Sequence, residues 1–317
     1  MKTKRISAFA PASIGNVSVG FDCLGLALER PGDIVSIETG CLPGAELVEV
    51  QGDGGALPRE TARNAAGAVV QKILQALGRR DALAVRLKKN LPLESGLGSS
   101  AASSAAAAVA ANAFLGSPFS RQELLPFAME GERIACGAPH ADNAAPALLG
   151  GITLIRSDDP ADIISIPYPD ELYCAVIHPE IKVATRQART VLPLAVPREV
   201  AIRQSSHLAA FVSGLHQSDW ELIARSMVDF IAEPFRKGLI PHFDEIKSAV
   251  RGTGTLGCGI SGSGPSIFAL CKGKTSAERT AAAMGEVYDT YKIMYETYVS
   301  AVNGKGAELL TDTERDT

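Results

Sequence analysis

The chain has 317 residues, of which 35 are acidic and 31 basic, so its formal net charge at pH 7 is −4. At 46% hydrophobic and 21% charged residues, the composition is that of a globular protein with a large core, and the length favours two domains. The slight negative charge provides no cationic field for nucleic acid or an anionic membrane, so neither partner is predicted.

The six cysteines are scattered along the chain without a C-x-x-C pair. This pattern is typical of reduced thiols, and we expect a cytoplasmic protein. The basic and then partly apolar start of the chain imitates a secretory signal, but Pro11, Gly15 and Asn16 interrupt it too early. No stretch approaches the roughly 18 consecutive apolar residues that a membrane helix requires.

Short apolar segments separated by Gly, Pro and Asp dominate the chain before residue 90. A helix is expected over residues 61–77, where the apolar residues fall on one helical face. The remaining apolar segments predict strands at residues 6–10, 23–28, 34–37 and 82–87.

The pattern becomes helical after residue 99. Strong helix formers predict a helix over residues 101–114, and a second helix is expected over 121–134. The next segment, GAPHADNAAPALLGG at 137–151, has two prolines and several small residues, and predicts an interruption of regular structure. The polar, proline-bearing segment 157–170 is where we expect a domain boundary.

The rest of the chain mixes strands and helices without regular alternation. Because both halves have hairpin-like spacings, the pattern favours an α+β fold over a doubly wound parallel sheet. We expect strands at 171–179 and 266–271, helices at 202–216 and 219–230, and a poorly ordered tail after Asn303.

The stretch PLESGLGSSAA at residues 92–102 raises three possibilities. A Walker A loop is excluded, because its G-x-x-x-x-G-K-[ST] pattern needs a lysine that is missing here. The dinucleotide pattern G-x-G-x-x-G/A fits Gly96, Gly98 and Ala101, but polar residues separate the preceding strand from the first glycine, so the match is weak. Glycine N–H groups, serine hydroxyls and a following helix N-terminus favour an anion site; the alternative is a tight turn into a packing helix.

A second glycine-rich segment, GCGISGSGPS at residues 257–266, has similar interpretations. It fits the same loose dinucleotide pattern, and it is either a sharp turn before a strand or part of an anion site. Two separated glycine-rich turns beside regular structure favour a phosphate site built from both halves of the chain.

Polar clusters accompany these two segments. Asn16 and Asp22 flank VSVGF in a loop, where both residue types are also common turn formers. His140, Asp142 and Asn143 lie among small residues, which leaves space for a small substrate, although an irregular loop explains them equally well.

Glu132 lies on the helix expected before that cluster. It is either a solvated helix residue or, with Ser100, an oxygen ligand for Mg²⁺ beside nucleotide phosphates. Thr185 and Arg189 are spaced to share a helix face, and Arg236 follows a predicted helix. Arginine binds carboxylates in a fixed fork geometry, so two arginines near a loop cluster fit a carboxylate substrate, although each alone is typical of a protein surface.

Four segments together resemble the homoserine kinases of the GHMP small-molecule kinase superfamily. They are APASIGNVSVGFDCLGLAL at 10–28, LPLESGLGSSAAS at 91–103, APHADNAAPALLGG at 138–151 and ISGSGPS at 260–266. The second and fourth belong to the superfamily, whereas the first and third are more specific to homoserine kinases. The resemblance covers nearly the whole chain.

This resemblance implies a two-domain α+β fold. The N-terminal ATP-binding domain, residues 1–165, would resemble domain 2 of ribosomal protein S5, and the C-terminal GHMP domain, residues 166–317, would have a ferredoxin-like core. The implied activity is ATP-dependent phosphorylation of the hydroxyl of L-homoserine in threonine biosynthesis, with Mg²⁺ and in a homodimer. Another GHMP-type kinase, such as a mevalonate-type enzyme, or a non-catalytic ligand-binding protein of this fold are the alternatives.

The resemblance also implies roles for residues at matching positions. The ATP-binding residues would be Asn64, Pro92, Leu93, Glu94, Ser95, Gly96, Leu97, Gly98, Ser99, Ser100, Ala101 and Ala102. Homoserine would be bound by Asn16, Asp22, His140, Asn143, Arg189, Arg236 and Gly262, with the arginines on its carboxylate. Ser100 and Glu132 would hold Mg²⁺, and the catalytic residues would be Thr185, Asp22 and Asn143.

Two positions modify this expectation. Glu94 stands where many family members have a small residue, usually glycine, and we expect its carboxylate to face solvent with only its backbone at the phosphates. Asn143 stands where some superfamily kinases have an aspartate base, and an amide cannot take up the proton at neutral pH. We therefore expect the homoserine proton to pass to the γ-phosphate directly or through water, with Asp22 fixing the amino and hydroxyl end of the substrate.

Overall fold

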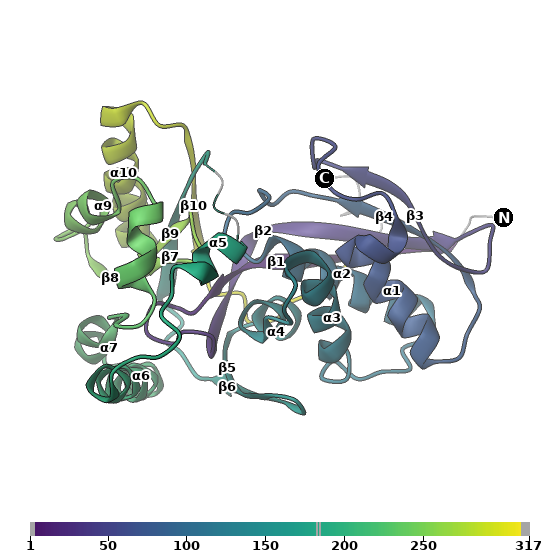
Figure 1. Ribbon diagram of the computed structural model, residues 1–317, viewed down its shortest axis with the longest axis horizontal. Coiled ribbons are helices and arrows are strands. Elements are labelled where there is room, and N and C mark those ends of the chain that lie inside the picture. Colours follow the sequence, from purple (N-terminus) through teal and green to yellow (C-terminus); the bar gives the residue numbers. More distant parts are fainter. Residues whose placement is uncertain (1–3, 182, 184, 312–317) are drawn as a thin grey trace.

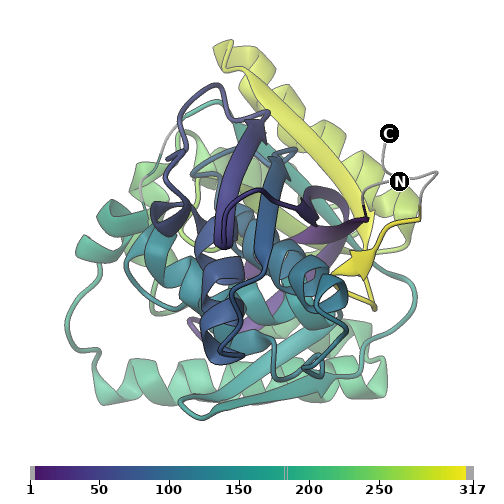
Figure 2. The same cartoon turned by 90° about the vertical axis from the view of Figure 1, so that its right-hand side faces the viewer.

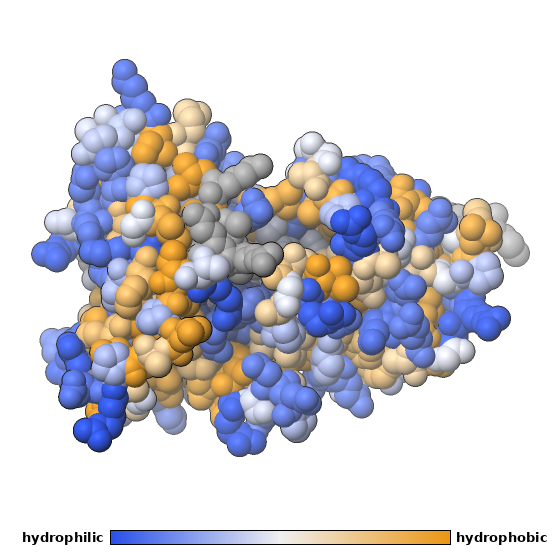
Figure 3. All heavy atoms as spheres, viewed as in Figure 1, coloured by the Kyte–Doolittle hydropathy of each residue, from blue (hydrophilic) through white to orange (hydrophobic). Residues whose placement is uncertain are grey.

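The computed structural model describes residues 4–181, 183 and 185–311, with residues 185–187 described by their backbone. Two sheets divide these residues into lobes that lie side by side along the long axis of the molecule (Figure 1). The N-terminal lobe is the first sheet with helices α1–α4, and the C-terminal lobe is the second sheet with helices α5–α10. The surface is hollowed between the lobes on the face shown in Figure 3. Within the part of the chain that the structure describes, no helix is long and apolar enough to cross a membrane.

The first sheet has seven strands in the order β11-β1-β2-β4-β3, and β5 extends it by pairing with both β2 and β6. Neighbouring strands are antiparallel except β3 and β4, which are parallel. The strands are β1 (Arg5–Gly15), β2 (Leu24–Thr39), β3 (Gly44–Gln51), β4 (Ala82–Lys88), β5 (Ile152–Asp158), β6 (Ala161–Ile166) and β11 (Glu308–Leu309).

The helices of the N-terminal lobe lie together on one side of its long strands (Figure 1). The central helix, α2, packs against β1 and β2 and is surrounded by α1, α3 and α4, as the view in Figure 2 also shows. It can be enclosed in this way because its buried residues are mostly alanines, with two serines and one asparagine, and such small side chains allow close approach of neighbouring backbones. The elements are the 3₁₀ helix η1 (Thr61–Arg63), α1 (Ala65–Ala76), α2 (Ser99–Phe114), α3 (Leu125–Cys136) and α4 (Ala141–Leu149).

The second sheet is antiparallel, with the strand order β10-β7-β9-β8. Its strands are β7 (Leu172–Pro179), β8 (Thr255–Ile260), β9 (Ile267–Lys272) and β10 (Tyr295–Ala301). α10 packs along all four of these strands, α9 lies beside α10, and α6 and α7 pack together near β8. The helices are α5 (Thr185–Thr190), α6 (Arg198–Gln217), α7 (Trp220–Ser226), α8 (Glu233–Arg236), the 3₁₀ helix η2 (Lys237–Leu239), α9 (Phe243–Ala249) and α10 (Lys274–Tyr291).

The structure is an α+β fold, as the sequence predicts, but three local expectations are wrong. The segment 137–151 is not an interruption, because it contains α4 with Pro146 inside the helix. The two strands expected at 23–28 and 34–37 are one strand, β2, in which Gly32 pairs with Pro11 beside a register shift of β1. The tail after Asn303 is ordered as far as β11, which pairs with β1 through Ala8 and Phe9.

Pro146 is tolerated in α4 because the helical turn that it disturbs packs closely against Gly25 of β2. Proline lacks the N–H that would bond to the carbonyl of Asp142. That carbonyl oxygen lies against β2 at Gly25, where a Cβ atom would come within 1.9 Å of it. A glycine on the strand therefore lets the helix approach closely at this point.

The segment 157–170, expected to separate two domains, contains the turn and second strand of the β5–β6 hairpin. The first sheet continues to Ile166 and the second begins at Leu172, whereas β11 returns to the first sheet. The division into residues 1–165 and 166–317 stays a prediction.

Candidate active site

A cavity of about 880 Å³ lies where the two lobes meet. The N-terminal lobe contributes the segments around residues 56–65, 93–103 and 132–143, and the C-terminal lobe contributes Arg189, Arg236, Gly262 and Ser263. A cavity of this size accommodates a ligand much larger than an amino acid. We use the name first glycine loop for residues 92–98 and second glycine turn for residues 261–266.

The first glycine loop takes the backbone conformation that a glycine-rich sequence permits. Gly96 and Gly98 have φ angles of 78° and 62°, and Glu94 has a φ angle of 54°. Gly98 is also the N-cap of α2, so the loop leads directly into the helix N-terminus. The first N–H groups of a helix have no partner within it and, with the helix dipole, favour an anion at this end.

The backbone conformation of Glu94 is one that glycine readily adopts. Its side chain is exposed, and its φ angle lies in the left-handed region that glycine adopts without a steric penalty. This conformation gives a physical reason why a glycine suits the position. Because Glu94 also lines the cavity, the direction of its carboxylate in an ATP complex stays a prediction.

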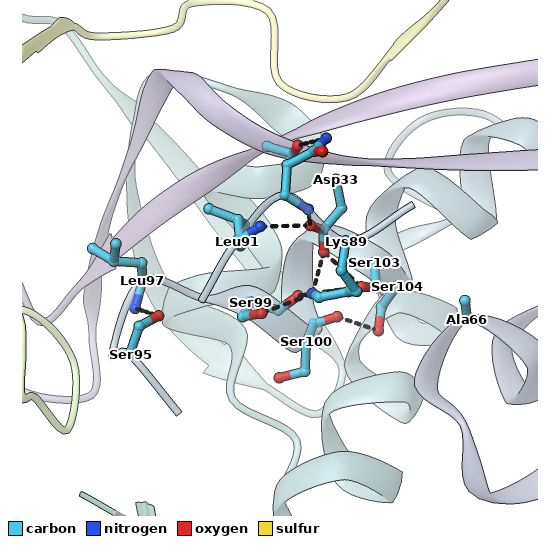
Figure 4. A network of polar contacts seen from close by, with 12 residues as sticks. Asp33, Ala66, Lys89, Leu91, Ser95, Leu97, Ser99, Ser100, Ser103 and Ser104 are labelled. Atoms are coloured by element: carbon cyan, nitrogen blue, oxygen red, sulfur yellow. Dashed lines mark hydrogen bonds and ion pairs between the residues drawn. The ribbon is translucent and has the colours of Figure 1, made fainter. Parts of the chain in front are cut away.

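A buried ion pair between Lys89 and Asp33 supports the start of α2, as Figure 4 shows. Lys89 Nζ contacts Asp33 Oδ2, and it also donates to the Ser99 carbonyl at 2.8 Å, to Ser99 Oγ at 2.7 Å and to Ser103 Oγ at 3.0 Å. The other carboxylate oxygen, Asp33 Oδ1, accepts the backbone N–H groups of Asn90 and Leu91. The sequence pattern predicts no role for Lys89 or Asp33. The one feature that could have indicated this ion pair is the charge of Lys89 directly after the strand β4.

Glu132 and Ser100 meet inside the cavity, as a metal site there requires. Glu132 is 3% exposed, and among the described residues its Oε1 is one of few buried side-chain oxygens without a hydrogen-bond partner. Burial raises the pKa of Glu132 to about 7, and the neighbouring Ser100 hydroxyl partly opposes this shift. A cation would supply the missing partner of Oε1, and carboxylate and hydroxyl oxygens suit Mg²⁺, so these residues fit the ion.

Not every predicted ATP-binding residue presents a side chain to the cavity. Leu93, Glu94, Ser95, Ser99 and Ser100 line it, together with both loop glycines. Pro92 does not line it, and the side chains of Leu97, Ala101 and Ala102 are buried in the core, so these positions can offer backbone groups only.

Asn64 lines the cavity, but its amide is already engaged. Its Oδ1 caps α1 by accepting from the N–H groups of Ala66 and Gly67, and its Nδ2 donates to the Pro58 carbonyl at 3.1 Å. Its direct effect is therefore to fix the wall of the cavity between residues 58 and 66.

Charged residues from both lobes also meet at the cavity. Arg189 Nη2 lies 3.0 Å from Asp22 Oδ1 and 3.1 Å from His140 Nδ1, and Asn16 Oδ1 accepts the N–H of Asp22 at 2.8 Å. Burial and the charge of Arg189 lower the pKa of His140, which favours the neutral imidazole. Asp22 and Arg189 are both about 40% exposed, so this pair is open to a ligand.

Arg236 is more enclosed than Arg189. It is 4% exposed, and its Nε and Nη1 donate to the carbonyls of Ala188 and Gly262 at 3.0 and 2.9 Å. Asn16 Nδ2 donates to the same Gly262 carbonyl at 2.9 Å. Burial lowers the pKa of Arg236, and the nearby Asp22 opposes that shift.

α4 carries the remaining polar groups. Asn143 Oδ1 accepts a hydrogen bond from Ser13 Oγ at 3.0 Å, which fixes the orientation of its amide. Asp142 is buried next to it, and burial together with the charge of Asp22 raises the pKa of Asp142 to about 7. The sequence pattern groups Asp142 with His140 and Asn143 as side chains able to hold a small substrate, and α4 places all three at the cavity.

The loop that follows β1 is strained. Asn16, Val17 and Ser18 have consecutive φ angles of 69°, 44° and 60°, and Asp22 has a φ angle of 56°. A β-branched residue such as Val17 rarely adopts this conformation. This strained loop presents Asn16 and Asp22 to the cavity, and backbone strain is common at ligand-binding sites.

The predicted residues Asn16, Asp22, His140, Asn143, Arg189, Arg236 and Gly262 thus line one cavity with Ser100 and Glu132. The side chain of Thr185 lies outside the described residues, so its predicted role is not assessed.

The cavity combines a helix N-terminus, which favours an anion, with the Ser100–Glu132 oxygen pair and a cluster of charged groups, an arrangement that suits a small-molecule kinase. Residues 64–151 match the family of GHMP kinases N terminal domain, and residues 211–290 match GHMP kinases C terminal. The chain belongs to the GHMP kinase family.

Within this family the chain groups with the homoserine kinases, as the resemblance of its motifs indicates. It is 47% identical to homoserine kinase of Chlorobium phaeobacteroides (strain BS1), covering 97% of this chain and 100% of that protein. It is 49% identical to homoserine kinase of Chloroherpeton thalassium, covering 90% of this chain and 92% of that protein.

Solved structures agree with this placement. A crystal structure of homoserine kinase from Cytophaga hutchinsonii has a TM-score of 0.95 at 44% identity and covers 98% of both chains. A mevalonate kinase from L. major has a TM-score of 0.70 at 16% identity, covering 93% of this chain and 95% of that one, and it shares the fold.

Proposed function

We propose that the chain transfers the γ-phosphoryl group of ATP to the hydroxyl of L-homoserine, a step of threonine biosynthesis. The activity and the substrate follow from the similarity of the chain to homoserine kinases, and the use of ATP follows from its membership of the GHMP kinases. The observation that supports it best is one cavity that combines a helix N-terminus, which favours an anion, with the Arg189–Asp22 pair.

We propose that residues 92–102 bind the ATP phosphates through backbone N–H groups and the hydroxyls of Ser95, Ser99 and Ser100. Ser100 and Glu132 would hold Mg²⁺, which neutralises phosphate charge and orients the phosphoryl group when it is bound. Asn64 supports the binding of the base by fixing the cavity wall, rather than through a free amide.

The homoserine end of the cavity offers groups of both signs. Arg189 and Arg236 suit the carboxylate, and Asp22 suits the ammonium group, because each pairing joins opposite charges in a partly enclosed site. Asn16, His140 and Gly262 then complete the pocket around the substrate. Asp22 leaves its pair with Arg189 as the substrate enters, since both groups gain a partner from it.

Phosphoryl transfer depends mainly on positioning and charge neutralisation, because the transition state is loose. Asn143 would hold the reacting hydroxyl through its amide, whose orientation Ser13 fixes. An amide cannot take up the proton, so the proton of homoserine passes to the γ-phosphate directly or through water. If Asp22→Asn abolished turnover while homoserine still bound, and high pH restored the rate, Asp22 would instead be the base.

A coupled ADP-release assay tests the reaction. We expect ADP release with homoserine, and only background release with mevalonate, galactose or no substrate. Activity with mevalonate would favour the other GHMP-type kinase, and nucleotide binding without turnover of any substrate would favour a non-catalytic protein.

The metal site is tested separately from activity. Mn²⁺ in the presence of ADP can be titrated against the protein and followed by electron paramagnetic resonance. We expect Glu132→Gln to weaken Mn²⁺ binding at least tenfold, the usual scale for loss of a charged ligand oxygen. Glu130→Gln is the matched control, because Glu130 lies on the same helix and pairs with Arg133 at 2.7 Å.

We further propose a cytoplasmic homodimer, as the resemblance to homoserine kinases implies. Light scattering coupled to size-exclusion chromatography tests the oligomeric state, and a monomer mass at working concentration would contradict it.

A further inference from the structure

The second glycine turn closes directly onto the first glycine loop. Ser266 N donates to the Ser95 carbonyl at 3.1 Å, and Ser261 Oγ donates to the Gly96 carbonyl at 2.7 Å. The contact is so close that a Cβ atom at Gly96 would lie 2.4 Å from the Ser261 carbonyl oxygen and 2.8 Å from that of Gly264. The C-terminal lobe therefore holds two successive peptide groups of the first glycine loop.

These two bonds fix the direction of N–H groups in the loop. A trans peptide is planar, so its C=O and N–H point in opposite directions. Because the Ser95 carbonyl is held by Ser266, the N–H of Gly96 in the same peptide must point away from the second glycine turn. Gly96 lines the cavity, so this N–H is one of the donors that the loop can offer to an anion.

Behind Ser266 lies a histidine that belongs to none of the recognised motifs. His178 is on β7, is 6% exposed, and its Nδ1 lies 3.0 Å from Ser266 Oγ. The adjacent residue, Ile177, pairs with Ile267 of β9, so the backbone places His178 beside Ser266. His178 does not line the cavity. Among the described side-chain contacts of His178, the hydrogen bond to Ser266 is the link towards the cavity.

We propose that His178 is a positioning residue for ATP binding, which acts through Ser266 to hold the Ser95–Gly96 peptide in the orientation that offers the Gly96 N–H to a phosphate. The inference rests on the proposed function, because it assigns the anion in the first glycine loop to ATP. The chain of contacts runs from β7 through the second glycine turn to the loop, and so couples the core of one lobe to the nucleotide site of the other.

The test uses two variants that each remove the side-chain hydrogen bond. His178→Leu keeps much of the buried volume, and Ser266→Ala keeps the backbone N–H that reaches Ser95. We expect each to raise the KM for ATP about 3- to 10-fold, the effect of losing one buried hydrogen bond, with little change in the KM for homoserine. Calorimetric titration with a non-hydrolysable ATP analogue should show the same loss in affinity.

A double variant tests whether the two residues act in one chain. If His178 acts through Ser266, His178→Leu combined with Ser266→Ala raises the KM for ATP no further than the larger single effect. Independent, multiplying effects would overturn the proposal. So would an unchanged KM for ATP in both single variants, even if they unfold at a lower temperature, because that outcome is a purely structural role.

Two further variants control for folding and for generic damage. His178→Asn retains a hydrogen-bonding group near the position of Nδ1, and we expect a KM for ATP close to that of the wild type. His207→Leu removes a half-buried histidine of the same lobe, whose Nδ1 lies 3.2 Å from the Ser226 carbonyl oxygen, and should leave the KM for ATP unchanged. If His178→Leu does not fold, Ser266→Ala and His178→Asn decide the question.

Failure of this proposal is distinct from failure of the proposed function. A wild-type protein without homoserine-dependent ADP release contradicts the function, whereas binding of the ATP analogue still measures the effect of His178. An active wild type with unaffected variants contradicts the role of His178 alone.

Discussion

Asp142 gives the site a pH dependence that can be measured in the absence of any ligand. Its pKa is raised from 3.8 to about 7, mainly by burial and then by Asp22. A carboxyl with a raised pKa binds more protons in the folded than in the unfolded chain. Its stabilising contribution is therefore complete below about pH 4 and is lost as the pH rises through about 7. We expect the stability of Asp142→Asn relative to the wild type to increase by roughly 2–4 kcal/mol between these pH values.

Urea unfolding at a series of pH values, at constant ionic strength, measures this difference. Asn112→Ala is a control, because it removes a buried amide of α2 that is not among the groups shifting the pKa of Asp142, and its pH profile should have the wild-type shape. Parallel profiles for Asp142→Asn and the wild type would show that Asp142 titrates normally.

Glu94 allows charge and backbone conformation to be separated. Its φ angle of 54° disfavours any L side chain, whereas its carboxylate is exposed. We expect Glu94→Gly to stabilise the protein by about 0.5–1 kcal/mol, because the relief of strain exceeds the extra entropy of the unfolded chain. Glu94→Ala keeps the strain and removes the charge, so it should not stabilise the protein.

The KM for ATP completes this comparison. If the Glu94 carboxylate faces solvent in the ATP complex, both variants should change the KM less than about threefold, since exposed charges interact weakly through water. A large, equal decrease in both variants would mean that the carboxylate turns inward and repels the triphosphate.

At the residue scale, the sequence predicts well which chemical groups line the cavity. It predicts poorly which residues hold these groups in place. Glycines, serines and arginines have side-chain or backbone properties that point to an anion and a carboxylate wherever they lie. Lys89 and Asp33 are 56 positions apart, so their pairing depends on the alignment of β2 with β4, which no local pattern contains. For Asn64 the sequence predicts the position but not the function of the side chain. The residue lies at the cavity, but its amide caps α1 and bonds to the Pro58 carbonyl.

At the scale of elements, the ion pair of Lys89 and Asp33 joins β2 and the end of β4 to the start of α2. Lys89→Met would leave the buried Asp33 carboxylate without its cation, and we expect a loss of about 3–5 kcal/mol in the free energy of unfolding. Lys89→Met combined with Asp33→Asn should recover part of this loss, because no buried charge is then left alone. Urea unfolding at pH 7 measures both variants.

An exposed pair provides the control for this measurement. Lys274 and Glu278 lie 3.7 Å apart on α10, and both side chains are more than half exposed. Lys274→Met should therefore cost less than about 1 kcal/mol. A similarly small cost for Lys89→Met would mean that water or a rearrangement compensates Asp33.

α4 and β2 show why the sequence misplaces some elements. Proline and glycine predict breaks because they disturb a regular backbone. In α4 the disturbed carbonyl of Asp142 lies against Gly25, and in β2 the pair Pro31 and Gly32 lies beside the register shift of β1. Both irregularities are accommodated by a neighbouring element, and such tertiary compensation cannot be seen in one segment alone.

At the scale of the whole molecule, the mixed pattern of strands and helices predicts the α+β class and the length favours two domains, whereas the fold of each domain is implied by the resemblance to known kinases. The return of β11 to the first sheet was missed because its two residues form no periodic pattern. One hydrophobic core cluster nevertheless runs through both lobes, from Val35 and Leu83 to Phe211 and Phe268. The lobes are therefore expected to unfold together.

The single tryptophan makes this expectation testable. Trp220 lies on α7 in the C-terminal lobe and packs against the shared core, far along the chain from the first glycine loop. Mg²⁺–ADP, at about 100 times its Kd, should stabilise the folded state by about 2.7 kcal/mol. Because the lobes share a core and the two glycine segments are bonded to each other, the urea midpoint from Trp220 fluorescence should shift as much as that from far-ultraviolet circular dichroism. A shift in the dichroism alone would mean that the C-terminal lobe unfolds independently of the nucleotide site.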